Sequence, residues 1–394
     1  MTGRERLLYA LNGKRPDRVP VTLFIQSQGH FVTQLAPEAD PWDFESLQKR
    51  IVDYQRSLGL DVHVRMLFFN PHEPVFAVFN LLNVDHETDE WKIHTEESRS
   101  GNTIQYRHTI TTPEGVLHQT FCINEERPDI FMYGCTEPPV KDEEDLRLAM
   151  KYEPPYSDET KAKMKENVSV IKKYVGDDGI VSGWANGTLF NNISGLIDQM
   201  ELYALFLTDP EFYEDLMAFA KKRVFDYTDA LLDAGVDAVC LSGNAAGGFV
   251  GNPCFHEYIL PHEKEYVAYC QRKGTPVIYH NCGKVMDLIP SYRELGARNI
   301  EPFSPEPLGD ADLAALHGMM QGEFTVTSGV DQVHVLQNGT KEEVRRVVRK
   351  AMAEGKKFDC FIMQNVDFLE FGTPLENVQE YAHTALSLAA YEYF

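Results

Sequence analysis

Short apolar runs alternate with longer amphipathic stretches along most of the chain. Eight of the runs have the length and the β-branched or aromatic content of buried strands, and a helical spacing of apolar residues follows them. The predicted strands are residues 18–25, 61–68, 179–184, 238–242, 276–280, 298–303, 324–328 and 358–363. Eight strands that each lead into a helix are the pattern of a (β/α)8 barrel, so we predict a single α/β TIM-barrel domain over residues 1–394.

Residues 75–140 interrupt this alternation. Two runs of alternating polarity, 103–110 and 116–121, flank the turn-forming sequence Pro113-Glu114-Gly115, which is the pattern of a β-hairpin. We predict that this segment is an antiparallel β insertion, a hairpin or a meander, after the second strand of the barrel.

An open, doubly wound sheet is the alternative architecture for the same alternation. The turn after the first strand, residues 25–30, lacks a Gly-x-Gly-x-x-Gly fingerprint, and no Gly-x-x-x-x-Gly-Lys-Ser/Thr segment occurs in the sequence. Sites for dinucleotides and nucleoside triphosphates are therefore disfavoured.

The net charge of the chain limits the kinds of partner that it can bind. With a formal net charge of −23, it is not expected to bind nucleic acid or an anionic membrane. No signal peptide is visible before the first amphipathic helix, and no apolar run approaches the ~18 residues of a membrane span, so we expect a cytoplasmic protein. The seven cysteines are scattered and form no Cys-x-x-Cys, which favours buried thiols over disulfides.

Polar residues follow the predicted strands at the end where a barrel places its active site. The most informative are His280 and Cys282 after the fifth strand, because an imidazole and a thiol two residues apart can bind one Zn²⁺. Such a pair also arises by chance beside a turn, so its position matters more than its spacing. The other candidates are Gln26, Gln28, His30, His63, Arg65, Trp184, Asn186, Ser242, Asn244, Glu301, Asp331, Gln364, Asn365 and Asp367.

A catalytic zinc needs a third protein ligand. Cys360 is the obvious thiol, but it stands about four residues before the end of the eighth strand, roughly 13 Å down the barrel at ~3.3 Å per residue, and we expect it to be buried core. Asp367 lies just past the strand end and has a competent oxygen ligand, although a loop carboxylate or a helix cap would explain it equally well.

Several collinear segments also match one known pattern. They are residues 15–21, 234–238, 280–283, 328–332, 339–344 and 372–378. Together they resemble the uroporphyrinogen decarboxylase superfamily, and more closely its zinc-dependent, corrinoid-linked methyltransferase branch. The resemblance implies a (β/α)8 barrel. The decarboxylases carry two arginines in an early segment and a catalytic aspartate after the second strand, and residues 24–30 and 66–70 of this chain contain neither.

The methyltransferase branch uses His-x-Cys and a late cysteine as zinc ligands. The resemblance therefore implies that His280 and Cys282 bind zinc, and it places Asp367 where the late cysteine falls. A His/Cys/Asp set would make the metal harder and more Lewis-acidic. Glu301, Asn244 and Gln364 are the candidates for orienting a ligand or bonding the substrate.

The function implied is methyl transfer from a methoxylated compound, an aromatic one included, to the cobalt of a corrinoid. The corrinoid is expected on a partner protein, because this chain has no Asp-x-His-x-x-Gly cobalamin motif. Three alternatives stay open: a methylcobalamin-dependent thiol methyltransferase, a divergent metal-free decarboxylase and a non-catalytic binding protein. A homodimer is also left open.

Overall fold

Parallel strands dominate the computed structural model of this chain, which describes residues 1–27, 30–40, 43–68, 81–127, 130–185, 187–243, 249–320 and 322–391. Internal contacts divide the chain into two units. The first comprises Met1–Leu67, Asn167–Trp184 and Gly235–Phe394, and the second comprises Phe68–Glu166 and Ala185–Ala234. The organisation of residues 1–394 as a single domain stays a prediction.

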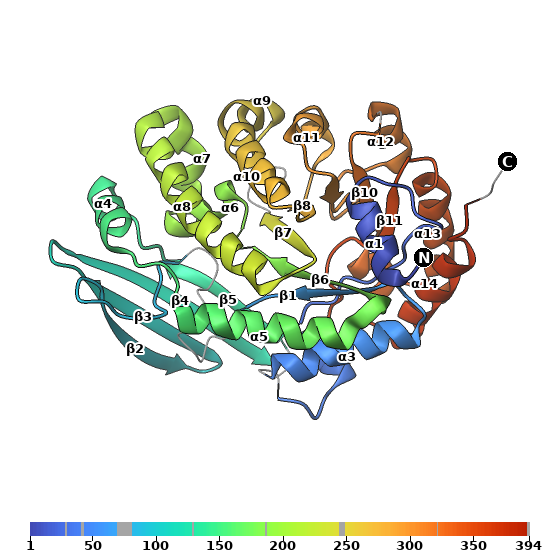
Figure 1. Cartoon of the computed structure of the whole chain (residues 1–394), viewed down its shortest axis with the longest axis horizontal. Coiled ribbons are helices and arrows are strands. Elements are labelled where there is room, and N and C mark those ends of the chain that lie inside the picture. Colours follow the sequence, from blue (N-terminus) through green and yellow to red (C-terminus); the bar gives the residue numbers. More distant parts are fainter. Residues whose placement is uncertain are drawn as a thin grey trace. The chain divides into compact units, whose positions relative to one another are not determined.

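In the first unit, a seven-stranded sheet runs in chain order among the described residues, and its neighbouring strands are parallel (Figure 1). Most positions of these strands are buried, which explains why they were visible as nearly continuous apolar runs. The strands are β1 (Val62–Met66), β6 (Gly179–Trp184), β7 (Ala238–Gly243), β8 (Val277–Asn281), β9 (Asn299–Glu301), β10 (Thr325–Val330) and β11 (Phe361–Asn365).

An irregular extended segment, in place of the predicted first strand, lies between β11 and β1 and completes the barrel. Residues 18–25 form no regular strand, but the extended segment hydrogen-bonds to β11, where Thr22 N–H donates to the Met363 carbonyl at 3.0 Å and Met363 N–H donates to Pro20 at 2.9 Å. A bridge between Gln26 and Arg65 joins the same segment to β1. Because Pro20 has no N–H, the ladder is interrupted, yet the barrel closes. The predicted (β/α)8 fold is confirmed.

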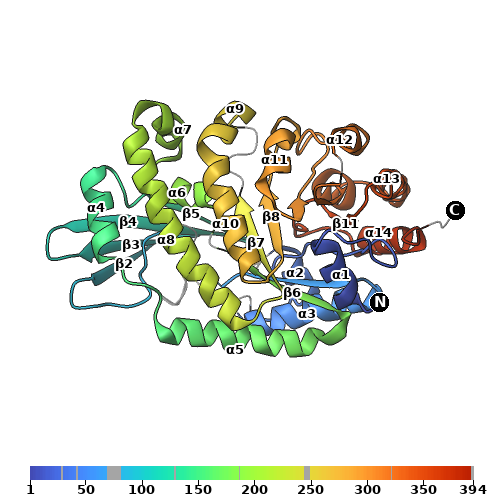
Figure 2. The same ribbon diagram turned by 45° about the horizontal axis from the view of Figure 1, so that its top comes forward.

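Helices alternate with the strands of this unit, and α13 packs on β10 and β11 (Figures 1 and 2). Among the described residues the α-helices are α1 (Gly3–Leu11), α2 (His30–Leu35), α3 (Phe44–Ser57), α9 (Asn252–Cys254), α10 (Leu260–Arg272), α11 (Ile289–Leu295), α12 (Leu313–Met319), α13 (Lys341–Gly355) and α14 (Leu375–Ser387). No helix in the described part of the chain is both long enough and apolar enough to cross a membrane.

Short 3₁₀ and π segments complete the first unit. The 3₁₀ segments are Gly176–Asp178 and Met286–Leu288, and the π segments are Phe255–Ile259 and Gln332–Gln337.

Helix α1 packs an apolar face against the barrel end opposite to the candidate site. Its Leu7, Ala10 and Leu11 belong to one core cluster with Cys360 and with residues of four strands. Cys360 is 3% exposed, and its thiol lies 3.4 Å from the carbonyl of Lys14. The prediction that Cys360 is a core residue is confirmed.

The second unit contains the antiparallel insertion. Its four strands are neighbours in chain order: β2 (Lys92–Ser100), β3 (Thr103–Thr111), β4 (Val116–Arg127) and β5 (Ile130–Glu137). The predicted hairpin is present, with Thr111 paired to Val116. The insertion after the second barrel strand is confirmed, although residues 75–80 and 128–129 of the predicted range lie outside the described residues.

Helices accompany this sheet in the second unit. They are α4 (Glu143–Tyr152), α6 (Leu189–Leu196), α7 (Gln199–Thr208) and α8 (Pro210–Ala234), and α5 (Asp158–Val175) runs from the second unit into the first.

A single side chain, that of Asn365, joins the end of β11 to the closing segment. Its Oδ1 accepts from Phe24 N–H at 2.9 Å, and its Nδ2 donates to the carbonyls of Phe24 at 2.9 Å and Asp367 at 2.6 Å. Asn365 is fully buried. The side-chain amide of Asn365 therefore replaces the backbone hydrogen bonds that a regular strand at Phe24 would make with β11. It also holds the loop that carries Asp367.

Asn365→Ala is expected to lower the free energy of unfolding by about 2–4 kcal/mol, because it removes two buried hydrogen bonds and one partly buried one and leaves Phe24 N–H without its acceptor. Denaturant unfolding measures the loss. The matched control is Asn338→Ala, which removes one exposed bond to the Val333 carbonyl and is expected to cost below ~0.5 kcal/mol. Equal losses in the two variants would refute the closing role of Asn365.

Candidate metal centre

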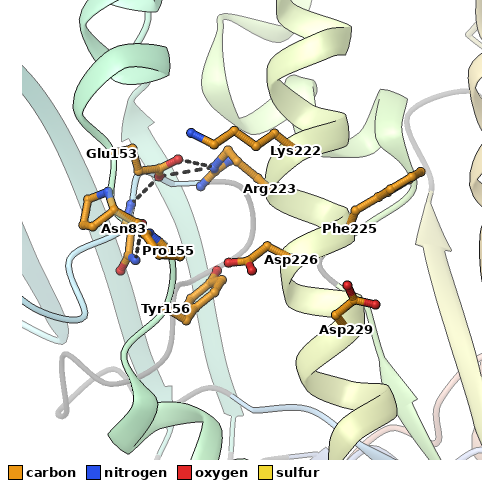
Figure 3. A pocket seen from close by; sticks show the side chains of 10 residues that line it. Asn83, Glu153, Pro155, Tyr156, Lys222, Arg223, Phe225, Asp226 and Asp229 are labelled. Atoms are coloured by element: carbon orange, nitrogen blue, oxygen red, sulfur yellow. Dashed lines mark hydrogen bonds and ion pairs between the residues drawn. The ribbon is translucent and has the colours of Figure 1, made fainter.

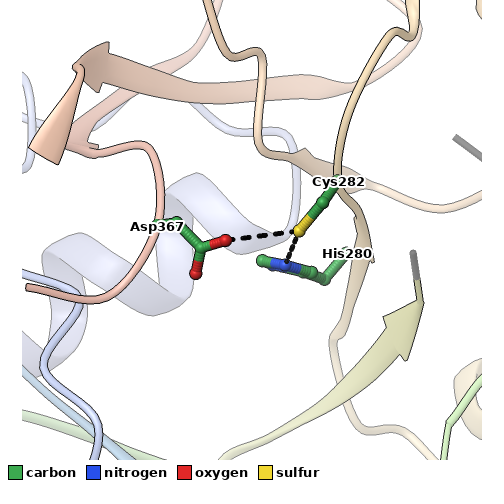
Figure 4. Close-up of side chains that lie close together, drawn as sticks. All are labelled: His280, Cys282 and Asp367. Carbon is green, nitrogen blue, oxygen red and sulfur yellow. Dashed lines mark hydrogen bonds between the residues drawn. The ribbon is translucent and has the colours of Figure 1, made fainter. Parts of the chain in front are cut away.

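Three side chains with metal-binding atoms meet at the carboxyl ends of β8 and β11 (Figure 4). His280 Nε2 lies 2.9 Å from Cys282 Sγ, which lies 3.4 Å from Asp367 Oδ2. One ligand atom from each residue lies within 4.8 Å of the others. The structure thus brings together the three residues named from sequence, and their role as metal ligands stays a prediction.

The strand ladder explains the position of each ligand. His280 is paired with Ser242 on β7 and with Glu301 on β9. Cys282 follows the end of β8, and its N–H donates to the Gly243 carbonyl at 3.0 Å. Gly283 then has a φ of 95°, a backbone conformation that favours glycine and lets the chain turn away from the barrel mouth.

The donor set suits zinc. Nitrogen, sulfur and carboxylate oxygen are its usual ligands, and at bond lengths of about 2.0–2.3 Å two donors of a tetrahedral zinc lie roughly 3.5 Å apart. The Cys282–Asp367 distance of 3.4 Å already matches this separation, and the His280–Cys282 distance of 2.9 Å would have to widen by about 0.6 Å. Three protein ligands leave one position for a substrate.

The other imidazole nitrogen of His280 is held by Glu301. Nδ1 lies 3.0 Å from Glu301 Oε1, so a proton on Nδ1 is donated to the carboxylate and Nε2 is free to bind a metal. Burial would raise the pKa of Glu301, but the Arg65 guanidinium and the His280 hydrogen bond together lower it well below its usual range. Glu301 is therefore an anionic acceptor.

The surroundings of Cys282 disfavour its charged form, whereas those of Glu301 favour the charged form. Burial, and then the negative charges of Asp367 and Glu301, raise the pKa of Cys282 well above its usual range. In the absence of a cation the thiol keeps its proton and bonds to His280 or Asp367. A divalent cation at the same place supplies the positive charge that stabilises the thiolate.

Two aromatic rings lie close to His280. The ring centroids of Trp184 and Phe24 lie 5.3 Å and 5.9 Å from that of His280, and the Arg65 guanidinium stacks 4.2 Å from the Phe24 centroid. Nε1 of Trp184 and Nε of Arg65 are buried donors without an acceptor among the described residues. The sequence reasoning did not single out Phe24, because nothing in an apolar run shows which ring faces the site.

Arg65 was one of many site candidates in the sequence, although its position there indicates a buried ion pair. It is a charged residue inside β1, all of whose residues are buried, and such a residue must be paired within the barrel. Its Nη1 and Nη2 lie 2.5 Å and 2.8 Å from the two oxygens of Glu301, and Nη2 also donates to Gln364 Oε1 at 3.1 Å. The candidate Gln364 thus binds Arg65 rather than the three metal-binding side chains.

Other candidates have separate partners. His63 bonds to Ser182 at 2.8 Å, His30 bonds to Glu370 at 3.1 Å, and Asp331 accepts the N–H groups that begin the π segment Gln332–Gln337. Gln26 pairs through its backbone with Arg65, Ser242 pairs with His280 in the ladder, and Asn365 closes the barrel. The candidates Asn244, Gln28 and Asn186 lie outside the described residues.

The second unit has a cleft of about 390 Å³ that the sequence did not predict (Figure 3). Tyr156 and the α8 residues Lys222 and Asp226 line it. A buried ion pair also lines it, with Arg223 Nε 3.0 Å from Glu153 Oε2. This pair is the second buried Arg–Glu pair of the chain among the described residues.

Comparison with known proteins adds two findings. The family model described as Uroporphyrinogen decarboxylase (URO-D) matches residues 133–387. Among solved structures, a methyltransferase from Methanosarcina mazei is similar over 98% of this chain and 99% of its own, with a TM-score of 0.70 and 15% sequence identity. At that identity the likeness shows a shared fold.

Two further results carry no argument. A D-psicose 3-epimerase covers 61% of this chain and 85% of its own at 12% identity, but the TM-score is 0.23. A search of curated proteins finds no significant match.

Substitution of Asp367 tests the third ligand. With Co²⁺ as a spectroscopic probe, Asp367→Cys is expected to show about twice the thiolate-to-cobalt charge-transfer absorbance of the wild type, because two thiolates replace one. Asp367→Ala is expected to lower metal affinity by at least about 10–100-fold, the loss typical of removing even a group that only orients a ligand.

The matched control for Asp367→Ala is Asp331→Ala, which removes a buried carboxylate at the end of another strand. It is expected to leave metal affinity unchanged. Unchanged affinity in Asp367→Ala as well, measured by chelator competition, would remove Asp367 from the ligand set.

Proposed function

Because this chain belongs to the uroporphyrinogen decarboxylase family, as its sequence resemblance predicted, we propose that it is a zinc-dependent methyltransferase of that family. It moves a methyl group from a methoxylated substrate to the cobalt of a corrinoid carried by a partner protein. The observation that carries the proposal is the convergence of His280, Cys282 and Asp367, with Glu301 fixing the imidazole.

The ligands define what the centre offers chemically. Zinc bound by His280, Cys282 and Asp367 would supply Lewis acidity to the ether oxygen of the substrate, so that this oxygen leaves with the electron pair of its bond to methyl. A carboxylate donates less electron density than a thiolate, so Asp367 favours an oxygen substrate over a sulfur one.

The walls of the site support an apolar, ring-bearing substrate. Phe24 and Trp184 lie against His280, so the candidate ligands have aromatic neighbours, which suit an aryl substrate. The Trp184 indole N–H has no acceptor among the described residues and is available to a substrate oxygen.

Decarboxylation of a tetrapyrrole fits these residues poorly. Such a substrate carries several carboxylates and needs free cationic side chains. Arg65 stands close to the ligands, but two of its nitrogens bind Glu301, and Phe24 lies in the segment where the family decarboxylases have arginine.

A direct assay tests the proposal. The protein is loaded with zinc and incubated with a cobalt(I) corrinoid protein and a panel of methoxyarenes, and we expect methylcobalt absorbance to grow with at least one of them. Consumption of methylcobalamin by a small thiol would reverse the direction. Release of CO₂ from a tetrapyrrole would show that the protein is a decarboxylase and not a methyltransferase. The absence of both bound metal and turnover would indicate a binding protein.

His280→Ala and Cys282→Ala are each expected to lose stoichiometric zinc and at least about 10³-fold of the methyl-transfer rate, because a metal contributes several kcal/mol to the transition state. Elemental analysis and the cobalt assay measure the two losses. Cys254→Ala, which removes a free and partly exposed thiol elsewhere, is the control and should keep both. Stoichiometric zinc retained in both His280→Ala and Cys282→Ala would overturn the site.

A further inference from the structure

Arg65 occupies the centre of the barrel interior beneath the candidate ligands. It is 3% exposed, and its guanidinium contacts side chains from four other parts of the barrel. These partners are Glu301 on β9, Gln364 on β11, Cys240 on β7 at 3.6 Å and the ring of Phe24 in the closing segment. Such a network fixes the guanidinium in one place.

The position of Glu301 follows from this network. Its Oε1 is shared between Arg65 Nη1 and His280 Nδ1, and its Oε2 is bound by Arg65 Nη2. Both oxygens are therefore occupied. Because Nδ1 and Nε2 are on different sides of the imidazole, Glu301 is held away from the side where Nε2 meets Cys282.

An unrestrained carboxylate this close to a divalent cation would be a ligand itself. Carboxylates bind zinc readily, and a fourth protein ligand would fill the position that a catalytic site keeps for its substrate. The formal charges also balance only with the arginine: thiolate, Asp367 and Glu301 contribute three negative charges, and a divalent cation with Arg65 contributes three positive ones.

We propose that Arg65 is a positioning residue that keeps Glu301 as the hydrogen-bond acceptor of His280 and thereby keeps the substrate position on the metal open. The inference rests on the proposed function, since it requires metal at His280, Cys282 and Asp367. It assigns to Arg65 a role in coordination number rather than in substrate binding.

Two variants of Co²⁺-loaded protein test this role. In Arg65→Met, Glu301 loses its partner and joins the metal, so the d–d absorbance is expected to fall as the cobalt goes from four to five ligands. Methyl transfer is expected to fall about 10–100-fold. In Arg65→Met/Glu301→Gln, the amide is a far weaker ligand but still accepts from His280 Nδ1, so the four-coordinate spectrum and most of the rate are expected to return.

The matched control is Arg223→Met, which breaks the other buried Arg–Glu pair, seen in Figure 3. It is expected to destabilise the protein to a similar extent while leaving the cobalt spectrum of the folded protein unchanged. A merely structural role of Arg65 predicts the same behaviour for Arg65→Met.

Folding defects do not remove the test. The double variant leaves no unpaired buried charge, and Arg65→Lys keeps the charge but not the two parallel hydrogen bonds, so it is expected to show a mixture of both spectra. A wild-type spectrum and rate in Arg65→Met or Arg65→Lys would overturn the inference alone. A wild-type protein that takes up no cobalt or zinc would overturn the proposed function together with it.

Discussion

The ion pair between Arg65 and Glu301 is the constraint on which the candidate centre depends. Removing two charges from water costs several kcal/mol for each ion, and only close geometry with further hydrogen bonds offsets that cost. Here the pair is bidentate, and Gln364 and His280 supply the additional bonds. The pair is thus weak evidence for stability but strong evidence for a fixed arrangement, because either partner alone would be an uncompensated buried charge.

The topology of the barrel brings this ion pair next to the candidate metal-binding side chains. Parallel strands in register place His280 beside Glu301, and the alternation of side chains along β1 brings Arg65 to the same interior space. The position of Asp367, the proposed third ligand, depends on closure of the barrel, since Asp367 follows β11 by two residues and Asn365 ties that strand end to Phe24. A barrel that failed to close there would keep the His280–Glu301 contact and lose the position of Asp367.

The sequence predicted those features that depend on local pattern. Strand β6 was predicted with its observed bounds because nearly all of its positions are buried on both faces, and His280 and Cys282 were located by their position at the end of β8. The prediction of a regular strand over residues 18–25 was wrong, because Pro20 interrupts the hydrogen-bond ladder with β11. The Arg65–Glu301 contact spans 236 residues of sequence, and no local pattern shows which buried charges will meet.

As a metal ligand, Asp367 would change the hardness of the proposed centre without changing its charge. A thiolate and a carboxylate each contribute one negative charge, so the balance with Arg65 would be the same with either residue at this position. The thiol of Cys282, however, has its pKa raised by burial and by the neighbouring Asp367 carboxylate. A metal that binds Cys282 as a thiolate must therefore displace the proton of that thiol. The aspartate thus opposes ionisation of the neighbouring thiol until a cation is bound, which would couple metal loading to proton release from Cys282.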